Sequence, residues 1–205
     1  MRLLCVSKTY GPETVRQAYQ AGERCFGENY VQEGLDKIVA LADLRNSLEW
    51  HLIGPLQSNK TRAVAENFDW VHSVDRERIA RRLAEQRPRQ LGPLQVCLQV
   101  NIDDEASKSG CSLAEAPTLA RLIAQLPGLR LRGLMAIPQP QADAQRMREP
   151  FGRLRELFER MRADGLPVDT LSMGMSDDLE AAIAEGSTMV RVGSALFGRR
   201  ERSAA

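Results

Sequence analysis

The sequence predicts an α/β fold, a single (β/α)8 TIM barrel that spans residues 1–205. Eight short apolar runs recur along the chain, and stretches with helical spacing follow nearly all of them. Strands that alternate with helices are joined by right-handed parallel crossovers, and eight such units point to a closed barrel more than to an open sheet. The 205 residues suffice for one domain with a substantial core but are few for this fold, so the loops must be tight.

The expected strands are apolar runs that are too short to be independent helices. In chain order they cover residues 3–7, 23–29, 48–54, 69–74, 94–102, 129–137, 169–174 and 188–193. The segment 139–145 is the most loop-like insert, and it lies inside the domain.

Four stretches between the strands carry apolar residues at helical spacing. The first helix begins at Pro12, the third begins at Pro150, and the fourth ends at Gly186. The four apolar stripes are Val15, Ala18 and Tyr19; Leu119, Leu122, Ile123 and Leu126; Leu154, Leu157, Phe158 and Met161; and Leu179, Ala182 and Ile183.

Composition and charge exclude several classes of protein. The formal net charge is +1, which gives no reason to expect nucleic-acid binding. No run approaches the ~18 apolar residues that a membrane span needs. The N-terminal segment "MRLLCVSKTY" lacks the longer apolar region and the cleavage site of a signal peptide. We therefore expect a cytoplasmic protein that binds neither nucleic acid nor membrane.

The cysteines and histidines do not show the spacing of metal ligands. There is no C-x-x-C pair, and neither histidine has a partner at ligand spacing. We expect Cys5, Cys25, Cys97 and Cys111 to be free, buried thiols. We expect no metal site at these cysteines or at His51 and His72.

Two glycine–serine turns lie at the ends of the seventh and eighth expected strands, in the stretches "LSMGMSDDLEAAIAEG" (171–186) and "VRVGSALFG" (190–198), each at the junction of an apolar strand and a helix. In eight-stranded barrels the functional groups lie at the carboxyl ends of the strands, and a phosphate site commonly follows strands seven and eight. Backbone N–H groups at a helix start, with close approach allowed by glycine, favour a phosphate. We therefore expect both turns to contact one phosphate.

A structural interpretation of the first turn stays open beside this one. Gly174 would then be an ordinary turn, and Ser176 or Asp177 would cap the next helix, with Glu180 completing a capping box. Because carboxylates repel an anion, we expect Asp177 and Asp178 to face away from any phosphate and to serve the helix terminus.

Lys8 directly follows the first expected strand, so its amine would project into the mouth of the barrel. A lysine at the end of a strand is often only a solvent-exposed residue where the chain leaves the sheet. Its alternative role is a Schiff-base amine, made nucleophilic by desolvation. A lysine together with a phosphate site suggests pyridoxal 5′-phosphate (PLP), which needs an amine for its aldehyde and a clamp for its phosphate.

Arg191 lies within the apolar eighth strand, two residues before Gly193. Near the pyridine nitrogen of PLP it would keep that nitrogen unprotonated, which weakens carbanion stabilisation and narrows the accessible chemistry. A surface or salt-bridged arginine is the alternative, although an unpaired guanidinium in an apolar strand is costly.

Long motifs resemble the YggS/PROSC-like family of pyridoxal phosphate homeostasis proteins. The resemblance runs from about Leu3 to Gly198. The matching segments are "VSKT" (6–9), "FGENYVQE" (26–33), "WHLIGPLQSNK" (50–60), "VNIDDEASKSG" (100–110), "RGLMAI" (132–137) and "LSMGMSDDLEAAIAEGSTMVRVGSALFG" (171–198).

The resemblance implies an alanine-racemase-like barrel of PLP fold-type III without the C-terminal β domain of the racemases. It matches Lys8 to the cofactor lysine and places Asn29 near the cofactor and Arg191 near the pyridine nitrogen. It matches Ser172, Gly193 and Ser194 to phosphate contacts, with Met173 and Gly174 close by. The family usually has a further helix before "VSKT", and we find no counterpart of it here, since the strand starts almost at Met1.

The function that this resemblance implies is a non-catalytic carrier that holds PLP and takes part in its homeostasis, delivery and amino-acid balance. Its expected partners are PLP and PLP-dependent apoenzymes, and we expect a monomer. The alternatives are a PLP-dependent amino-acid racemase or related lyase and, more distantly, a cofactor-free Schiff-base aldolase.

Lys60 and Lys108 follow strands three and five and could face the same mouth, although solvated loop lysines are the simpler interpretation. Glu28 and Tyr30 could carry protons, but they fit a strand exit and helix cap equally well.

Overall fold

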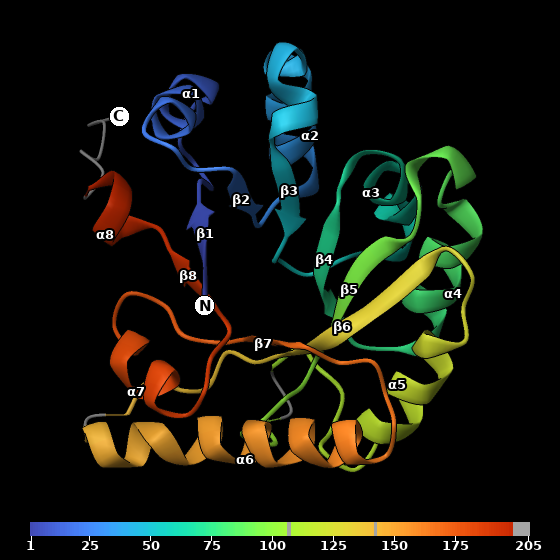
Figure 1. Cartoon of the computed structure of the whole chain (residues 1–205), viewed down its shortest axis with the longest axis vertical. Coiled ribbons are helices and arrows are strands. Elements are labelled where there is room, and N and C mark those ends of the chain that lie inside the picture. Colours follow the sequence, from blue (N-terminus) through green and yellow to red (C-terminus); the bar gives the residue numbers. More distant parts are fainter. Residues whose placement is uncertain (106–107, 142, 199–205) are drawn as a thin grey trace.

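The computed structural model describes residues 1–105, 108–141 and 143–198 and confirms the predicted barrel. Eight parallel strands follow one another around a closed sheet, and β8 pairs with β1 (Figure 1). Their bounds are β1 Arg2–Val6, β2 Cys25–Glu28, β3 Glu49–Leu52, β4 Trp70–Val74, β5 Leu94–Gln99, β6 Leu129–Met135, β7 Thr170–Ser172 and β8 Met189–Val192. Each of the eight expected strands is present.

A helix follows each strand. The α-helices are α1 Pro12–Gln20, α2 Val31–Ala40, α3 Thr61–Asn67, α4 Glu77–Gln86, α5 Ala116–Ala124, α6 Ala144–Ala163, α7 Leu179–Ala184 and α8 Ser194–Phe197. Within the described residues, three short 3-10 helices accompany them: η1 Ala42–Ser47, η2 Ser58–Lys60 and η3 Arg89–Leu91. As predicted, α1 begins at Pro12, and Gly186 follows the end of α7 with φ +85°. In the described part of the chain, no helix combines the length and apolar character needed to cross a lipid bilayer.

The expected helix start at Pro150 is wrong. Helix α6 begins at Ala144, and Pro150 lies inside it. An internal proline costs a helix about 3 kcal/mol because it lacks an N–H group and crowds the preceding turn. The turns around it compensate, since Met147 and Phe151 are buried against the barrel and each such side chain contributes roughly 1.5–3 kcal/mol. Packing against the barrel therefore allows α6 to begin before Pro150, the residue at which the sequence pattern placed its start.

Apolar packing divides into two regions. The larger cluster lies between the strands and the helices and contains the most buried aromatic residues, among them Phe26, Trp50 and Phe68. The smaller cluster comprises Leu4, Trp70, Cys97, Met135 and Met189. Its members come from five different strands, as expected for the layered filling of a barrel interior.

The alternation of side chains along each strand connects this interior with the two ends of the barrel. Along β1, every second residue from Leu4 through Val6 to Lys8 belongs to the interior cluster or to the wall of the mouth. The same alternation along β8 runs from Met189 through Arg191 to Gly193. Because side chains of a strand alternate between its faces, the register of each strand decides which residues reach the mouth.

Gly133 on β6 gives a test of this register. A Cβ atom there would lie 1.8 Å from the carbonyl oxygen of Thr170 on β7, and the backbone φ is +155°. We expect Gly133→Ala to lower the free energy of unfolding by about 3 kcal/mol, through the combined cost of overpacking and strained backbone. Urea-induced unfolding measures this change.

Gly152 in α6 is the matched control, because a Cβ there would meet only ordinary contacts, the nearest at 3.5 Å from Glu185 Oε2. Gly152→Ala should leave stability unchanged or raise it by about 0.5–1 kcal/mol, since alanine favours a helix interior. Equal stability for the two variants would contradict the described packing of β6 against β7.

Candidate functional site

A cavity of about 270 Å³ lies at the carboxyl ends of the strands. Five of the eight predicted site residues line it: Lys8, Asn29, Arg191, Gly193 and Ser194. The other lining residues are Val6, Tyr10, Ile53, Ile137, Met175, Ser176 and Asp177. The structure thus brings together residues from β1 and from β8, which are far apart in sequence and paired in the sheet.

A second cavity of about 240 Å³ adjoins the first and shares Asn29, Ile53 and Ile137 with it. Lys108 lies in the wall of this second cavity and pairs with Asp103, at an N–O distance of 2.7 Å. Lys60 is exposed in η2 and lies in neither wall. Of the two additional lysines considered from the sequence, only Lys108 therefore faces the mouth.

Lys8 differs from the other lysines that contribute to the barrel ends. Its side chain is partly buried, and it has no ion-pair or hydrogen-bond partner within residues 1–105, 108–141 and 143–198. Lys37, by contrast, is buried in ion pairs with Glu28 and Glu33 at 2.7 and 2.8 Å. An amine without a carboxylate partner, held in a cavity wall, is available to a ligand.

The group formed by Ser7, Glu28, Glu33 and Lys37 anchors the strand ends beside Lys8. Glu28 Oε1 accepts hydrogen bonds from the Ser7 hydroxyl at 2.6 Å and from Lys37 Nζ at 2.7 Å. Burial raises the pKa of Glu28, and these two donors partly offset that effect. Glu28 is fully buried and lies outside the cavity wall, so its position supports the anchoring interpretation over a proton carrier. Tyr30 is exposed and also lies outside that wall.

Arg191 is a buried cation without a carboxylate partner in the described residues. Nη1 donates to the Ser172 carbonyl at 2.5 Å and to the Ser172 hydroxyl at 2.9 Å, and Nη2 donates to the Ala136 carbonyl at 3.0 Å. Burial lowers the pKa of Arg191 to about 10, so the guanidinium stays charged at neutral pH. Within the described chain its Nε–H has no partner, which leaves this donor for whatever occupies the cavity.

The first glycine–serine turn reaches the cavity through residues later than the sequence predicted. Ser172 and Met173 are fully buried, and neither they nor Gly174 lie in the cavity wall. Ser172 instead contacts Arg191, while the Gly174 carbonyl accepts the backbone N–H of Arg191 at 2.9 Å. Gly174 has φ +94°, and a Cβ there would lie 2.6 Å from the Ala182 Cβ, so the turn requires glycine.

Of the two acidic residues of this turn, Asp178 serves the helix terminus as expected, and Asp177 differs from expectation. Asp177 lies in the cavity wall, contrary to the expectation that it faces away. Helix α7 is capped at Asp178, not at Ser176 or Asp177. Asp178 Oδ1 accepts the backbone N–H of Met175 at 2.5 Å and so closes the turn itself.

Close backbone packing positions Asn29. A Cβ atom at Gly54 would lie 2.1 Å from the Asn29 carbonyl oxygen, so the end of β3 can pass the end of β2 only with glycine at this position. Asn29 lines both cavities as a result.

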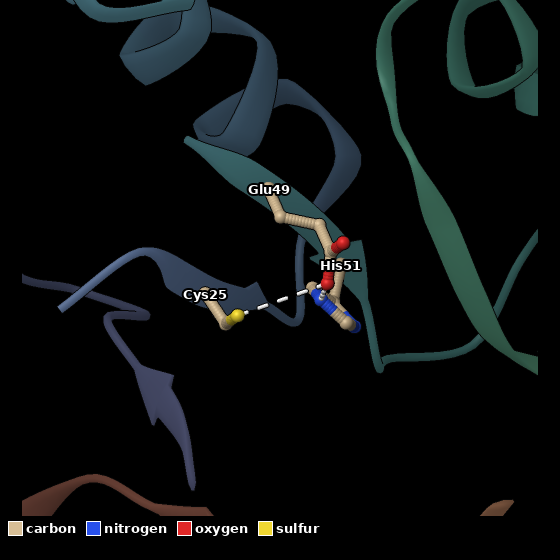
Figure 2. Close-up of side chains that lie close together, drawn as sticks. All are labelled: Cys25, Glu49 and His51. Carbon is tan, nitrogen blue, oxygen red and sulfur yellow. Dashed lines mark hydrogen bonds and ion pairs between the residues drawn. The ribbon is translucent and has the colours of Figure 1, made fainter. Parts of the chain in front are cut away.

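A polar group at the opposite end of the barrel was not expected from the sequence. Cys25, Glu49 and His51 point toward one another from β2 and β3 (Figure 2), with possible ligand atoms within 4.8 Å of one another. Arg2 Nη2 donates to Glu49 Oε1 at 2.6 Å and lies 2.9 Å from Cys25 Sγ. A guanidinium therefore already neutralises this group, and we interpret it as an ion-pair cluster.

The two histidines are the interior residues that sequence reasoning missed. His51 Nδ1 lies 2.9 Å from His72 Nε2, and His72 Nδ1 lies 2.8 Å from Ser172 Oγ. Burial lowers the pKa of both histidines, and for His51 the nearby Glu49 partly offsets this effect. The alternation along β3 and β4 could have placed them on the interior face, but the contact between them depends on strand register.

Comparison with known proteins places this chain among characterised sequences. The family model for the alanine racemase N-terminal domain matches residues 1–201. The chain is 61% identical over 202 residues to a pyridoxal phosphate homeostasis protein of Pseudomonas aeruginosa, covering 98% of this chain and 86% of the relative. It is 56% identical to the protein of the same name from Escherichia coli, with the same coverage.

Solved structures agree with this placement. PipY of Synechococcus elongatus without PLP superposes with a TM-score of 0.90 at 40% identity, covering 97% of this chain and 93% of PipY. PipY with PLP bound superposes with a TM-score of 0.87 at 39% identity, covering 97% and 92%. Alanine racemase of Corynebacterium glutamicum shares the fold, with a TM-score of 0.73 at 19% identity, and this chain spans 57% of its length.

The buried histidines generate a pH prediction. Burial keeps them neutral in the folded protein, whereas in the unfolded chain they titrate near pH 6.5. Below that pH the unfolded chain binds more protons than the folded protein, so stability must fall on acidification. We expect a loss of up to about 1.4 kcal/mol per pH unit for each histidine between about pH 6.5 and about pH 5.

Urea-induced unfolding over this pH range tests the expectation. Glu49 does not contribute in the same pH window. Burial raises the pKa of Glu49, but its interactions with His51 and Arg2 outweigh this effect and lower the pKa to about 2. Its contribution to stability is therefore lost only between pH 4.5 and about 2. His72→Gln should reduce the slope, since one neutral histidine then remains. A stability that stays constant or rises on acidification would contradict neutral, buried histidines.

Proposed function

The chain belongs to the alanine racemase N-terminal domain family and to the pyridoxal phosphate homeostasis proteins within it, and from this premise we propose that it binds PLP at the barrel mouth and serves in PLP homeostasis. The observation that carries the proposal is the convergence of an unpaired lysine, a buried arginine and two glycine–serine turns on one cavity. PipY, at 39% identity over nearly the whole chain, has been solved with PLP bound.

The residues of the cavity fit the chemical groups of PLP. The ligand combines an aldehyde, a pyridine ring and a phosphate, and when bound it supplies electrophilic chemistry at its aldehyde carbon. Lys8 offers an amine, and Arg191 offers a donor through Nε–H. The apolar side chains of Val6, Ile53 and Ile137 offer surfaces for an aromatic ring.

Lys8 is the residue that we assign to the aldehyde. Its Nζ would condense with the aldehyde carbon to form a C=N bond and release one water, the Schiff base that the sequence predicts. Lys8 has no carboxylate partner in the described residues, so no ion pair competes with the aldehyde for its amine. This assignment distinguishes Lys8 from Lys37, whose charge is held by two carboxylates.

Arg191 is assigned to the ring nitrogen. A guanidinium can only donate hydrogen bonds, so a ring nitrogen that faces it must accept and stays unprotonated. An unprotonated ring withdraws electrons weakly, which favours storage of the ligand over reactions at an amino-acid α-carbon. The three hydrogen bonds to Ser172 and Ala136 fix the orientation of this donor.

The phosphate is assigned to the turns after β7 and β8. The second turn supplies Gly193 and Ser194 at the start of α8, where backbone N–H groups have no partner inside the helix. The first turn contributes Ser176, while Met173 and Gly174 support it from behind the cavity wall. Ser172 acts through Arg191 in this arrangement.

A carrier agrees with the cavity better than a racemase does. Racemisation needs a second acid or base across the substrate, and the tyrosine of this cavity, Tyr10, donates its hydroxyl to the Gly198 carbonyl at 2.7 Å. The same proposal includes a cytoplasmic monomer that hands PLP to apoenzymes.

The first test is covalent trapping on Lys8. The protein mixed with PLP should turn yellow, and borohydride should then fix the ligand on the peptide that contains Lys8. Lys8→Ala should lose both the colour and the fixed mass, because the amine is missing. Lys60→Ala is the matched control and should keep both, since Lys60 lies outside the cavity walls. Trapping that persists in Lys8→Ala and disappears in Lys60→Ala would overturn the assignment.

The second test separates carrier from racemase. PLP-loaded protein is incubated with alanine in deuterated water, and the deuterium at the α-carbon is followed by mass spectrometry. We expect no exchange above the rate with free PLP, because an unprotonated ring stabilises a carbanion weakly. Sustained exchange that depends on Lys8 would favour the racemase.

A further inference from the structure

A chain of hydrogen bonds crosses the barrel from the floor, where the strands begin, to the mouth. At the floor, Glu49 Oε1 lies 2.8 Å from His51 Nε2 (Figure 2). His51 Nδ1 lies 2.9 Å from His72 Nε2, and His72 Nδ1 lies 2.8 Å from Ser172 Oγ. Ser172 Oγ in turn accepts Arg191 Nη1 at 2.9 Å, which brings the chain to the cavity wall.

The middle of this chain is sealed from water. His51, His72 and Ser172 have no exposed surface, and Arg191 is 3% exposed. The residues come from β3, β4, β7 and β8 and pass through the interior cluster, where His51 stacks on Trp70 with ring centroids 5.2 Å apart. Polar groups in such a place are costly unless each one is satisfied, so the arrangement of their protons is constrained.

The two ends determine the direction of every hydrogen bond. Arg191 can only donate, and ionised Glu49 can only accept. Glu49 is kept ionised by Arg2, which donates to the same carboxylate oxygen at 2.6 Å. The chain must therefore begin with a donor at the mouth and end with an acceptor at the floor.

The groups between them then have one consistent arrangement. His51 donates from Nε2 to Glu49, so its Nδ1 accepts from His72 Nε2. The remaining nitrogen of His72, Nδ1, accepts from the Ser172 hydroxyl, which itself accepts from Arg191. Both histidines are neutral Nε2–H tautomers in this scheme, and every donor points from the mouth toward the floor.

We propose that Glu49, His51, His72 and Ser172 form a hydrogen-bond relay of fixed direction that positions the Arg191 guanidinium at the cavity wall. The inference rests on the proposed function for its consequence, since Arg191 is the group assigned to the ring nitrogen of PLP. It goes beyond that function by assigning roles to four residues, all of which lie outside the cavity wall and which together reach the opposite end of the barrel. They are positioning residues, because they act through Arg191.

The relay explains how a buried guanidinium remains oriented without a carboxylate beside it. The Ser172 hydroxyl, polarised by His72, is a better acceptor for Arg191 than an isolated hydroxyl would be. The negative charge of Glu49 acts on the far end of the same chain. A proton added at His51 would force His72 to donate from Nδ1, and the Ser172 hydroxyl would lose its acceptor.

The first experiment measures the tautomers in the cofactor-free protein. The chain contains two histidines, so ring ¹H–¹⁵N correlation spectra of the wild type and of His51→Gln assign all four ring nitrogens. We expect Nε2–H with unprotonated Nδ1 for both rings at neutral pH. An Nδ1–H tautomer or a doubly protonated ring at either position would overturn the relay.

The second experiment cuts the relay at Ser172. Ser172→Ala should weaken PLP binding about tenfold, the equivalent of one hydrogen bond of about 1.4 kcal/mol to a charged group. Ser172→Thr, which keeps the hydroxyl, should restore affinity. Cys25→Ser is the matched control: Cys25 contacts Arg2 and Glu49 at the floor but is not itself a member of the relay, so this variant should bind PLP as the wild type does.

A spectroscopic readout separates positioning from a general structural effect. Loading with PLP should shift the ring nitrogens of His72 in the wild type and leave them unchanged in Ser172→Ala, because the connection to Arg191 is missing. If the wild type binds PLP and the Ser172→Ala affinity and His72 shifts equal those of the wild type, the relay is wrong. If the wild type does not bind PLP, the proposed function fails, while the tautomers still decide the relay.

Discussion

The buried guanidinium of Arg191 is the constraint on which the mouth of this barrel depends. A charge that is 3% exposed and has no ion-paired carboxylate among the described residues needs other compensation. Two carbonyl groups and one hydroxyl accept its hydrogen bonds, and Asp178 acts on it from a longer distance. Those acceptors belong to Ser172 at the end of β7 and to Ala136 just beyond β6, so one side chain connects three neighbouring strands. The turns that follow these strands are thereby held around one cavity.

The register of the closed sheet delivers the other groups to the same place. Residues at alternate positions of a strand enter the interior, so one strand can contribute to the floor, to the middle and to the mouth. Along β3 and the residue that follows it, the contributing residues are Glu49, His51 and Ile53, which belong to the floor cluster, the histidine pair and the cavity wall. A shift of one residue would remove all three from the interior. The packing of Gly133 against Thr170 and of Gly54 against Asn29 shows how little room such a shift would have.

Two lysines at this end of the barrel have different roles because their neighbouring residues differ. Lys37 is buried and paired with Glu28 and Glu33, and it joins the ends of β1 and β2 through the Ser7 carbonyl at 2.7 Å. Lys8, one residue beyond Ser7, enters the cavity with no such partner in the described structure. The same amine is thus a structural cation in one position and a group available to a ligand in the other.

Local sequence patterns determined the eight strands, two of the three predicted helix boundaries (Pro12 and Gly186) and the positions of the two glycine–serine turns. These features depend on periodicity and on glycine and proline chemistry between near neighbours. Position at the ends of the expected strands also singled out Lys8 and Arg191, and the resemblance of long motifs added Asn29; the structure brings these three residues to one cavity. Only tertiary structure decided the extension of α6 through Pro150, the capping of α7 at Asp178 and the burial of Ser172 behind the cavity wall. His51 and His72 are 21 positions apart and touch only because β3 and β4 pair in one register, and the hydrogen bond from His72 spans 100 positions to Ser172. Such contacts depend on closure of the sheet, which no short segment of the sequence encodes by itself.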